Sequence, residues 1–313
     1  MTLPWTDPPA GGHAPTRNYP LARRFAVGRF TCWTLEGGRQ WLDGGAMFGV
    51  VPRPLWERRI KPDERHRIPL ALRCLLVEHP DGLVLVDTGL GNKENAKFRD
   101  IYGVANDGHG GPTQLEDALR EAGHTATSVA WVINTHLHFD HAGGNTAKAG
   151  DRTVLAFPNA TYVVQKGELG FASHTNERTA ASYLPPNFAP VAEASRFRLV
   201  NGELALLPGI HLLPTPGHVP HHQSVLVSDG GEAACFLGDL VPTAAHLPAP
   251  WIMGYDLEPL VTLETKKRVL ARAAAERWQL VFEHDPEIAR ARVAPDPKHG
   301  YAPEPVDTVE LAS

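Results

Sequence analysis

Short runs of β-prone, mostly apolar residues in the first third of the chain predict a β-sheet. The runs LALRCLLVEH and DGLVLVDTG lie on either side of the turn signal at residues 79–82, a pattern typical of a β-hairpin. Shorter alternating runs begin upstream, in RFAVGRFTCWTLEGG. In the second half, ATYVVQ, LLPGIHLLPTPGH, HQSVLVSDG and EAACFLGD predict short strands separated by Gly, Pro and Asp, and QLVFEHD predicts a last buried strand.

Two segments show the longer period of a helix. TQLEDALREAG is predicted to begin a helix at Thr113 and to end it at Gly123. The longest helical pattern is LEPLVTLETKKRVLARAAAERW, whose apolar positions include Leu263 and Val269. Between these segments, SVAWVINTH reads as a buried strand. This mixture predicts an α/β fold in which two sheets pack together and helices lie outside them.

The length of 313 residues allows one large domain or two small ones. Residues 1–22 are rich in Pro and Gly and are expected to form a loosely held arm. Residues 23–300 are predicted to form a single domain, and the sequence shows no repeat of fixed period. Residues 301–313 are expected to form a C-terminal tail.

Composition narrows the function classes. The formal net charge of −5 argues against a general nucleic-acid binder. No run approaches the roughly 18 apolar residues that a membrane span needs, and the segment after Arg23 and Arg24 is too short and polar for a signal peptide. We therefore expect a cytoplasmic protein with no nucleic-acid or membrane partner. Cys32, Cys74 and Cys235 lie in apolar surroundings and are expected to be buried thiols.

The densest chemistry lies in NTHLHFDHAGGN, residues 134–145. Imidazole and carboxylate groups together are suited to zinc, iron or manganese. His136 and His138 would point to the same side of an extended segment, and Asp140 and His141 can face a second point nearby. The histidines are not four apart on a helix, so the spacing indicates a strand end opening into a loop. The small residues 142–144 would let another backbone approach closely.

THLHFDHAGG resembles the T-H-x-H-x-D-H signature of the metallo-β-lactamase-fold hydrolases. Later motifs match that family in order: TPGHVPHHQS supplies His218, CFLGDL supplies Asp239 and VFEHDP supplies His284. His221 and His222 are alternatives to His218, although PGH fits the family pattern better. The resemblance covers roughly residues 25–290 and implies an αββα sandwich with a metal site at one edge of its two sheets.

The resemblance also implies a dinuclear centre with shared ligands. One metal would be held by His136, His138 and His218, the other by Asp140, His141 and His284, and Asp239 would bridge them. Zinc is the first expectation, and iron, manganese or cobalt could use the same ligands. Two such cations lower the pKa of a shared water and polarise a carbonyl. As residues at this centre, Asp239 and Asp140 are expected to be catalytic as well as ligands. Asp87, in LVDTGLG, resembles the family aspartate that orients a metal ligand.

The segment DGGAMFGVVPRPLWERRIKPDERHRI resembles the branch that contains quorum-quenching N-acyl-homoserine lactone lactonases and methyl parathion hydrolases. Met47, Phe48 and Trp56 are expected to form an apolar wall for an acyl chain, with His246 and Tyr255 also beside the substrate. The resemblance favours hydrolysis of a lactone, with N-acyl-homoserine lactones first and phosphotriesters as side substrates. A homodimer that pairs through residues 47–56 is a further expectation.

Three alternatives stay open. A glyoxalase II-like thioesterase shares the metal ligands, but its family usually carries a basic C-terminal region, whereas residues 285–313 here are mixed in charge. An organophosphate hydrolase would use the same centre on phosphorus. A binding protein with a structural metal is a different class, and a structural zinc site closes with about four ligands and needs no paired centre.

Overall fold

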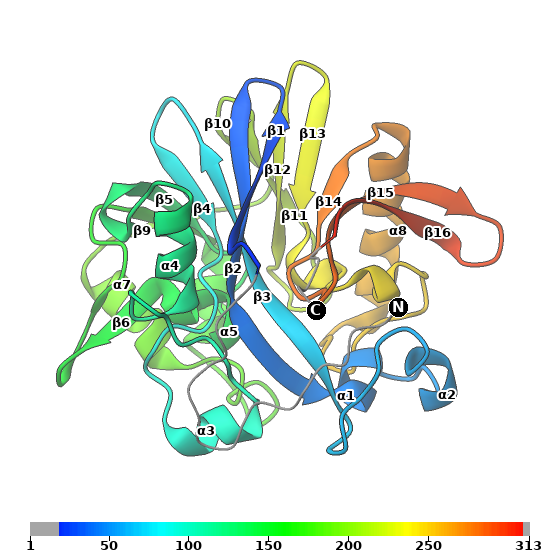
Figure 1. The fold of residues 1–313 in the computed structure, drawn as a ribbon, viewed down its shortest axis with the longest axis horizontal. Coiled ribbons are helices and arrows are strands. Elements are labelled where there is room, and N and C mark those ends of the chain that lie inside the picture. The colour runs from blue at the N-terminus through cyan, green and yellow to red at the C-terminus, as the bar shows by residue number, and fades with distance from the viewer. Residues whose placement is uncertain (1–18, 309–313) are drawn as a thin grey trace.

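The computed structural model describes residues 19–308, so most of the predicted arm at residues 1–22 lies outside the described residues. Two seven-stranded sheets form the centre of the molecule (Figure 1). The first sheet contains, in spatial order, β1 (Ala22–Val27), β2 (Phe30–Asp43), β3 (Arg67–Glu78), β4 (Leu83–Val86), β5 (Val129–Ile133), β8 (Thr161–Gln165) and β9 (Phe197–Val200).

In the second sheet the spatial order of the strands is their order in the chain. It contains β10 (Leu204–Leu207), β11 (Ile210–Pro214), β12 (Gln223–Asp229), β13 (Glu232–Phe236), β14 (Gln279–Val281), β15 (Ile288–Asp296) and β16 (Gly300–Thr308). A separate hairpin is made by β6 (Thr146–Ala149) and β7 (Arg152–Leu155). All the strands predicted from apolar runs are present.

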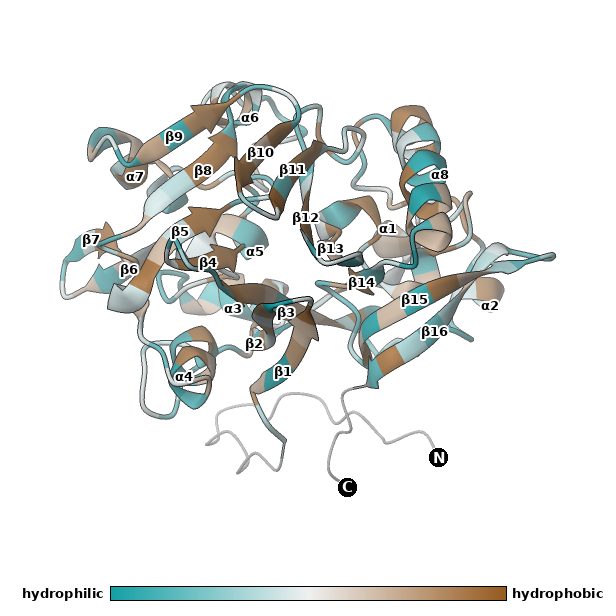
Figure 2. Cartoon of the chain, turned by 90° about the horizontal axis from the view of Figure 1, so that it is seen from above, coloured by the Kyte–Doolittle hydropathy of each residue, from teal (hydrophilic) through white to brown (hydrophobic). Residues whose placement is uncertain are grey.

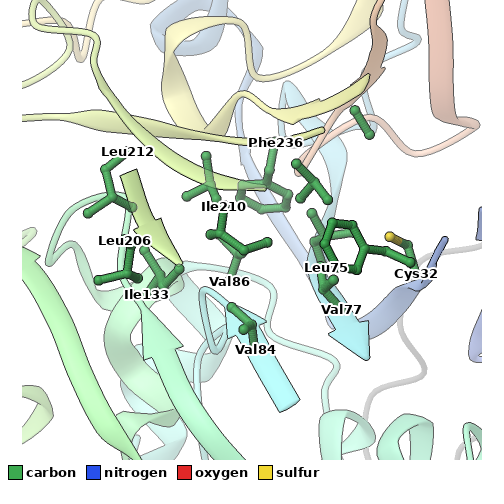
Figure 3. Close-up of a cluster of buried hydrophobic side chains, with 14 of the residues drawn as sticks. Cys32, Leu75, Val77, Val84, Val86, Ile133, Leu206, Ile210, Leu212 and Phe236 are labelled. Carbon is green, nitrogen blue, oxygen red and sulfur yellow. The ribbon is translucent and has the colours of Figure 1, made fainter. Parts of the chain in front are cut away.

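The main core lies between the two sheets (Figure 3). Strand side chains alternate between faces, and β3 shows this directly: Leu75 and Val77 point into the core between the sheets, whereas Cys74 and Leu76 pack on the other face. Phe236 contributes to the same core from the second sheet. Because both faces of β3 are buried, its sequence reads as a nearly continuous apolar run. Figure 2 shows the same concentration of hydrophobic residues on β3 and β4.

Helices cover the outer faces, which completes the αββα sandwich that the sequence predicted. They are α1 (Gly44–Phe48), α2 (Arg53–Trp56), α3 (Ala96–Ile101), α4 (Gln114–Glu121), α5 (Phe139–Ala142), α6 (Lys166–Ala172), α7 (Ala189–Glu193) and α8 (Pro259–Ala275). Helix α4 packs on the first sheet and α8 on the second, at opposite sides of the molecule (Figure 1).

Helix α4 begins and ends where its sequence predicts. Thr113 and Glu116 form a capping box, in which each side chain bonds the backbone of the other residue. Leu115, Ala118 and Leu119 follow at helical spacing and pack against the first sheet. The burial of this apolar stripe fixes the helix on the outer face of the sandwich.

The C-terminal tail predicted from residue 301 is wrong for residues 301–308. Strand β16 pairs with β15 in antiparallel register, with Arg292 opposite Glu304 and Val293 opposite Pro303. The prolines and charges that made this segment read as a tail are tolerated on an edge strand. Among the described residues, no helix is long and apolar enough to cross a membrane. Cys32, Cys74 and Cys235 are free and buried, as predicted.

Candidate metal centre

The histidine-rich motif follows β5 directly and contains the first turn of a helix. His136 and His138 lie in the extended link, and Asp140 and His141 lie on α5. The predicted loop is thus in part a short helix, which carries Asp140 and His141. Gly143 and Gly144 follow at a close approach: a Cβ would lie 2.2 Å from the Leu90 oxygen at the first and 2.1 Å from the Thr88 oxygen at the second. The prediction that small residues admit another backbone here is confirmed.

The remaining predicted ligands come from the ends of strands in the second sheet. His218 follows β11, Asp239 lies in the turn Gly238–Leu240 after β13, and His284 follows β14. Strands β13 and β14 are parallel neighbours, as are β4 and β5 in the first sheet. Parallel strands end at the same edge, where open α/β folds place ligands. The sandwich therefore brings motifs that are far apart in the chain to one place.

The side chains of His136, His138, His218 and Asp239 form one group of potential ligands, with their atoms within 4.8 Å of one another. His218 Nε2 lies 3.1 Å from Asp239 Oδ2 and 3.1 Å from His138 Nδ1. His136 Nε2 lies 3.9 Å from the same Asp239 oxygen. All of these residues are buried.

Asp140, His141 and His284 form a second group beside the first. The Nε2 atoms of His141 and His284 face each other at 3.2 Å. Asp239 also reaches this group, since its Oδ1 lies 3.1 Å from His284 Nε2 and its Oδ2 lies 3.4 Å from His141 Nε2. Asp239 therefore lies between the two groups, where the resemblance places a bridging carboxylate.

The two groups have the donor set and spacing of cation sites. In a tetrahedral site with bonds of about 2.0–2.2 Å, ligand atoms are about 3.3–3.6 Å apart, and the separations here run from 3.1 to 3.9 Å. His136 Nε2 is buried and has no hydrogen-bond partner within the described chain. A buried nitrogen without a partner is costly unless something binds it. The residues present therefore fit divalent cations.

The second nitrogen of several ligands is held by another residue, which orients the ring. His218 Nδ1 lies 2.9 Å from Asp256 Oδ1, and His284 Nδ1 lies 2.8 Å from the Ala71 carbonyl oxygen. In both cases Nε2 is left facing the other ligands. Asp239 is held through its backbone, whose N–H donates to His222 Nε2 at 3.1 Å. His222 thus contacts the backbone of Asp239, and His218, not His222, belongs to the group of potential ligands.

His141 lies between two buried carboxylates. Its Nδ1 lies 3.0 Å from Asp87 Oδ2 and 3.0 Å from Glu283 Oε2. Asp87 also accepts hydrogen bonds from the backbone N–H and the hydroxyl of Thr135, at 2.7 and 2.6 Å, and so fixes the start of the motif. The contact between Asp87 and a candidate ligand is the one the resemblance implied.

Sequence reasoning missed Asp256, Glu283 and Gln40. Gln40 Nε2 donates to Asp140 Oδ2 from strand β2. Glu283 precedes His284 in FEHD, so its position next to a ligand was a usable signal. Asp256 is 38 residues from His218, and Gln40 is 100 residues from Asp140, so no local pattern connects them.

Burial and neighbouring charges set the protonation of the ligands. Burial, together with the adjacent His141, His138 and His218, holds the pKa of His136 well below its ordinary value, so its Nε2 lone pair is free to bind a cation. Burial also lowers the pKa of His141, but the carboxylates of Glu283 and Asp239 outweigh it and raise that pKa well above the ordinary value. The carboxylates of Glu283 and Asp239 thus favour positive charge at the group formed by Asp140, His141 and His284.

A cavity of about 260 Å³ opens onto these ligands. It is lined by Leu42, Met47, Leu70, Tyr102, His138, Phe139, Asp140, Arg178, Thr179, Ala181, Ser182, His218, Asp239, Met253, Tyr255, Leu257 and His284. Of the residues expected beside the substrate, Met47 and Tyr255 line the cavity.

Phe48, Trp56 and His246 do not line the cavity, which corrects the expected apolar wall. Phe48 stacks between Trp56 and His246, with ring centroids 5.3 and 4.5 Å apart, in a buried cluster behind Met47. His246 Nε2 lies 2.8 Å from the Met47 carbonyl oxygen. Successive helix residues point about 100° apart, so of the two neighbours Met47 and Phe48 on α1 only Met47 lines the cavity. The other three hold Met47 in place.

We expect that replacing Asp256 by alanine weakens cation binding by about 10–100-fold, because His218 loses the acceptor that fixes its ring. Zinc titration of metal-free protein against a competing chelator measures this affinity. Asp100→Ala is the control, since Asp100 is exposed and pairs with Arg65 at 3.3 Å. Equal zinc affinities for the Asp256 and Asp100 variants would show that the Asp256 contact does not support the site.

The sequence is similar to those of known proteins. The sequence profile of the metallo-beta-lactamase superfamily matches residues 68–310. An N-acyl homoserine lactonase from Bacillus cereus is 31% identical over 226 residues, which cover 70% of this chain and 82% of that protein. Another from a Bacillus sp is 29% identical over 231 residues, covering 71% and 84%.

Among solved structures, a probable metal-dependent hydrolase from Staphylococcus aureus is similar over most of the chain. It has 28% sequence identity and a TM-score of 0.81, and the match covers 91% of this chain and 99% of the other. The fold, the ordered motifs and the relatives agree with one another. The chain is therefore an enzyme that belongs to the metallo-beta-lactamase superfamily, as the resemblance of its motifs predicted.

Proposed function

We propose that the protein is a metal-dependent hydrolase that opens lactone rings, with N-acyl-homoserine lactones as its leading substrates. The observation that carries this proposal is the position of Asp239 between two groups of buried ligands at the floor of a partly apolar cavity. The relatives named N-acyl homoserine lactonase support the choice of substrate.

The proposal includes two divalent cations, with zinc the first expectation and iron, manganese or cobalt as alternatives. His136, His138 and His218 would hold one, and Asp140, His141 and His284 the other, with Asp239 shared. When bound, such a pair lowers the pKa of a bound water towards neutrality and stabilises negative charge on a carbonyl oxygen.

The chain's own residues then bind and orient the substrate. Leu42, Met47, Leu70 and Met253 give the cavity an apolar side that suits an alkyl chain and excludes water. Asp239 is placed to pass a proton, at its Oδ1 or Oδ2, to the ring oxygen. In the overall step the water oxygen forms a bond to the acyl carbon, the bond from that carbon to the ring oxygen breaks, and the water proton ends on the ring oxygen. A protonated leaving oxygen is needed because a free alkoxide leaves poorly.

A pH-indicator assay across lactones, thioesters and phosphotriesters tests the substrate class. We expect zinc-loaded protein to open N-acyl-homoserine lactones with a higher kcat/KM than it shows for any thioester or phosphotriester. A much faster thioester would instead support the glyoxalase II-like alternative, and a faster phosphotriester would support an organophosphate hydrolase.

The cytoplasmic location and the homodimer stay predictions. On the segment expected at the dimer contact, Val50 and Leu55 are exposed, with relative exposures of 93% and 49%. Burial of such side chains is what a contact between two copies would require. Sedimentation analysis of the protein as purified measures the oligomeric state.

A further inference from the structure

Arg178 lies in the wall of the metal cavity, and the proposed chemistry does not use it. It is the one Lys or Arg among the described residues that line this cavity. Its side chain is exposed, so its guanidinium lies where the cavity meets solvent. A purely apolar ester would offer little for a charged donor at this position to bind, so the placement of Arg178 indicates a substrate with a polar group.

The Arg178 guanidinium uses few of its N–H donors within the protein. Its Nη2 donates to the Gly254 carbonyl oxygen at 2.8 Å, and no carboxylate of the described residues forms an ion pair with it. A guanidinium carries five N–H donors, so most of them remain open to a ligand. The bond to Gly254 also ties Arg178 to the segment that contributes Met253 and Tyr255 to the cavity.

The segment that carries Arg178 is fixed to the metal motif. Asn176 Oδ1 accepts hydrogen bonds from the backbone N–H groups of Arg178 and Thr179, at 3.0 and 3.2 Å. Further along, the Ser182 carbonyl oxygen accepts from the Phe139 N–H at 2.9 Å, between the candidate ligands His138 and Asp140. Arg178 is therefore presented from an ordered turn, and its position is coupled to the site.

The lining of the cavity thus combines two chemically different kinds of residue. Arg178, Thr179 and Ser182 supply polar groups, and Leu42, Met47 and Leu70 supply apolar ones. An acylamino lactone has matching parts: a ring ester for the cations, an amide carbonyl beside the ring, and an alkyl chain. A charged donor makes a stronger hydrogen bond to such a carbonyl than a neutral hydroxyl does.

Resting on the proposed lactonase function, we propose that Arg178 is a specificity-determining residue that binds the amide carbonyl oxygen of the substrate. The contact is made by guanidinium N–H groups not used by Gly254. It selects lactones that carry an acylamino arm over lactones that do not. It contributes to binding before and during ring opening, so it acts mainly on KM.

The test compares one lactone that has the arm with one that lacks it. We expect Arg178→Met to raise KM for N-hexanoyl-homoserine lactone by about ten- to a hundredfold, the loss typical of a hydrogen bond to a charged group, with kcat little changed. The KM for unsubstituted γ-butyrolactone should stay the same. Arg178→Lys, which keeps a charged donor, should recover part of the loss.

Matched variants separate recognition from a structural role. Arg152→Met removes an exposed arginine on β7, away from the cavity, and should change neither KM. If Arg178→Met alters both lactones equally, Arg178 acts only as a tie to Gly254 and the inference is wrong. It is also wrong if Tyr255→Phe, rather than Arg178→Met, produces the amide-dependent loss. A wild-type protein that opens neither lactone would refute the proposed function itself, a result distinct from these.

Discussion

Replacing Asp239 by alanine should remove both bound metal and ring-opening activity. Loss of a residue that only orients a ligand typically costs about 10–100-fold in metal affinity or activity. Asp239 contacts candidate ligands of both groups, at 3.1 Å from His218 Nε2 and 3.1 Å from His284 Nε2, so the loss on its replacement should exceed about a hundredfold in each measurement. Removal of this carboxylate also leaves the surrounding histidines without the negative charge that balances a cation.

Two further variants make this result specific to the shared carboxylate. Asp239→Asn keeps the size and the backbone contact to His222 but not the charge, so we expect it to lose metal nearly as strongly. Asp151→Ala changes an exposed residue between β6 and β7 and should behave as wild type. Elemental analysis and the lactone assay are run on the same preparations. Normal turnover by the alanine variant, at unchanged metal content, would refute the bridging role.

The strands, helix α4 and the first motif of candidate ligands were predictable because their signals are local. Buried strands such as β3 require apolar residues on both faces, and α4 carries its own capping box and apolar stripe. Four residues with ligand-type side chains lie within six positions, and this spacing alone indicates a cation site: His136, His138, Asp140 and His141. The later histidines and Asp239 were found only by resemblance, since nothing local connects them to the motif.

The substrate wall was not predictable in the same way. Apolar character placed Phe48 and Trp56 beside the substrate, but the same property serves a buried cluster equally well. Which side of a short helix faces the cavity depends on packing against His246 and Met253, which lie about 200 residues later. Nothing in the sequence indicated Arg178, because an exposed arginine in a polar segment is ordinary until the fold places it in the cavity that the candidate ligands also line.

The sequence also contains no signal for a buried ion pair in the first sheet, near the site. Arg73 on β3 is fully buried, and its Nε donates to Glu36 Oε1 on β2 at 2.7 Å. Its Nη1 donates to the carbonyl oxygens of Phe282 and Asp285, on either side of Glu283 and His284. This one side chain thus links the two sheets and holds the turn that presents a candidate ligand.

Replacing Arg73 by methionine should therefore lower the free energy of unfolding by about 3–5 kcal/mol, the cost of leaving a buried charge without its partner. The carboxylate that loses this partner is that of Glu36, which is only 3% exposed. Urea denaturation of metal-free protein measures the loss without a contribution from bound cations. The control is Arg65→Met, which removes an exposed pair with Asp100 and should change stability by less than about 1 kcal/mol.

The double variant Arg73→Met with Glu36→Leu distinguishes the ion pair from the link to the turn. An apolar pair of similar volume can replace a buried ion pair at little cost, so the double variant should regain much of the lost stability. It cannot restore the hydrogen bonds to Phe282 and Asp285, so zinc affinity should stay below that of wild type through the misplaced His284. If instead Arg73→Met is no less stable than Arg65→Met, the buried pair does not hold the two sheets together.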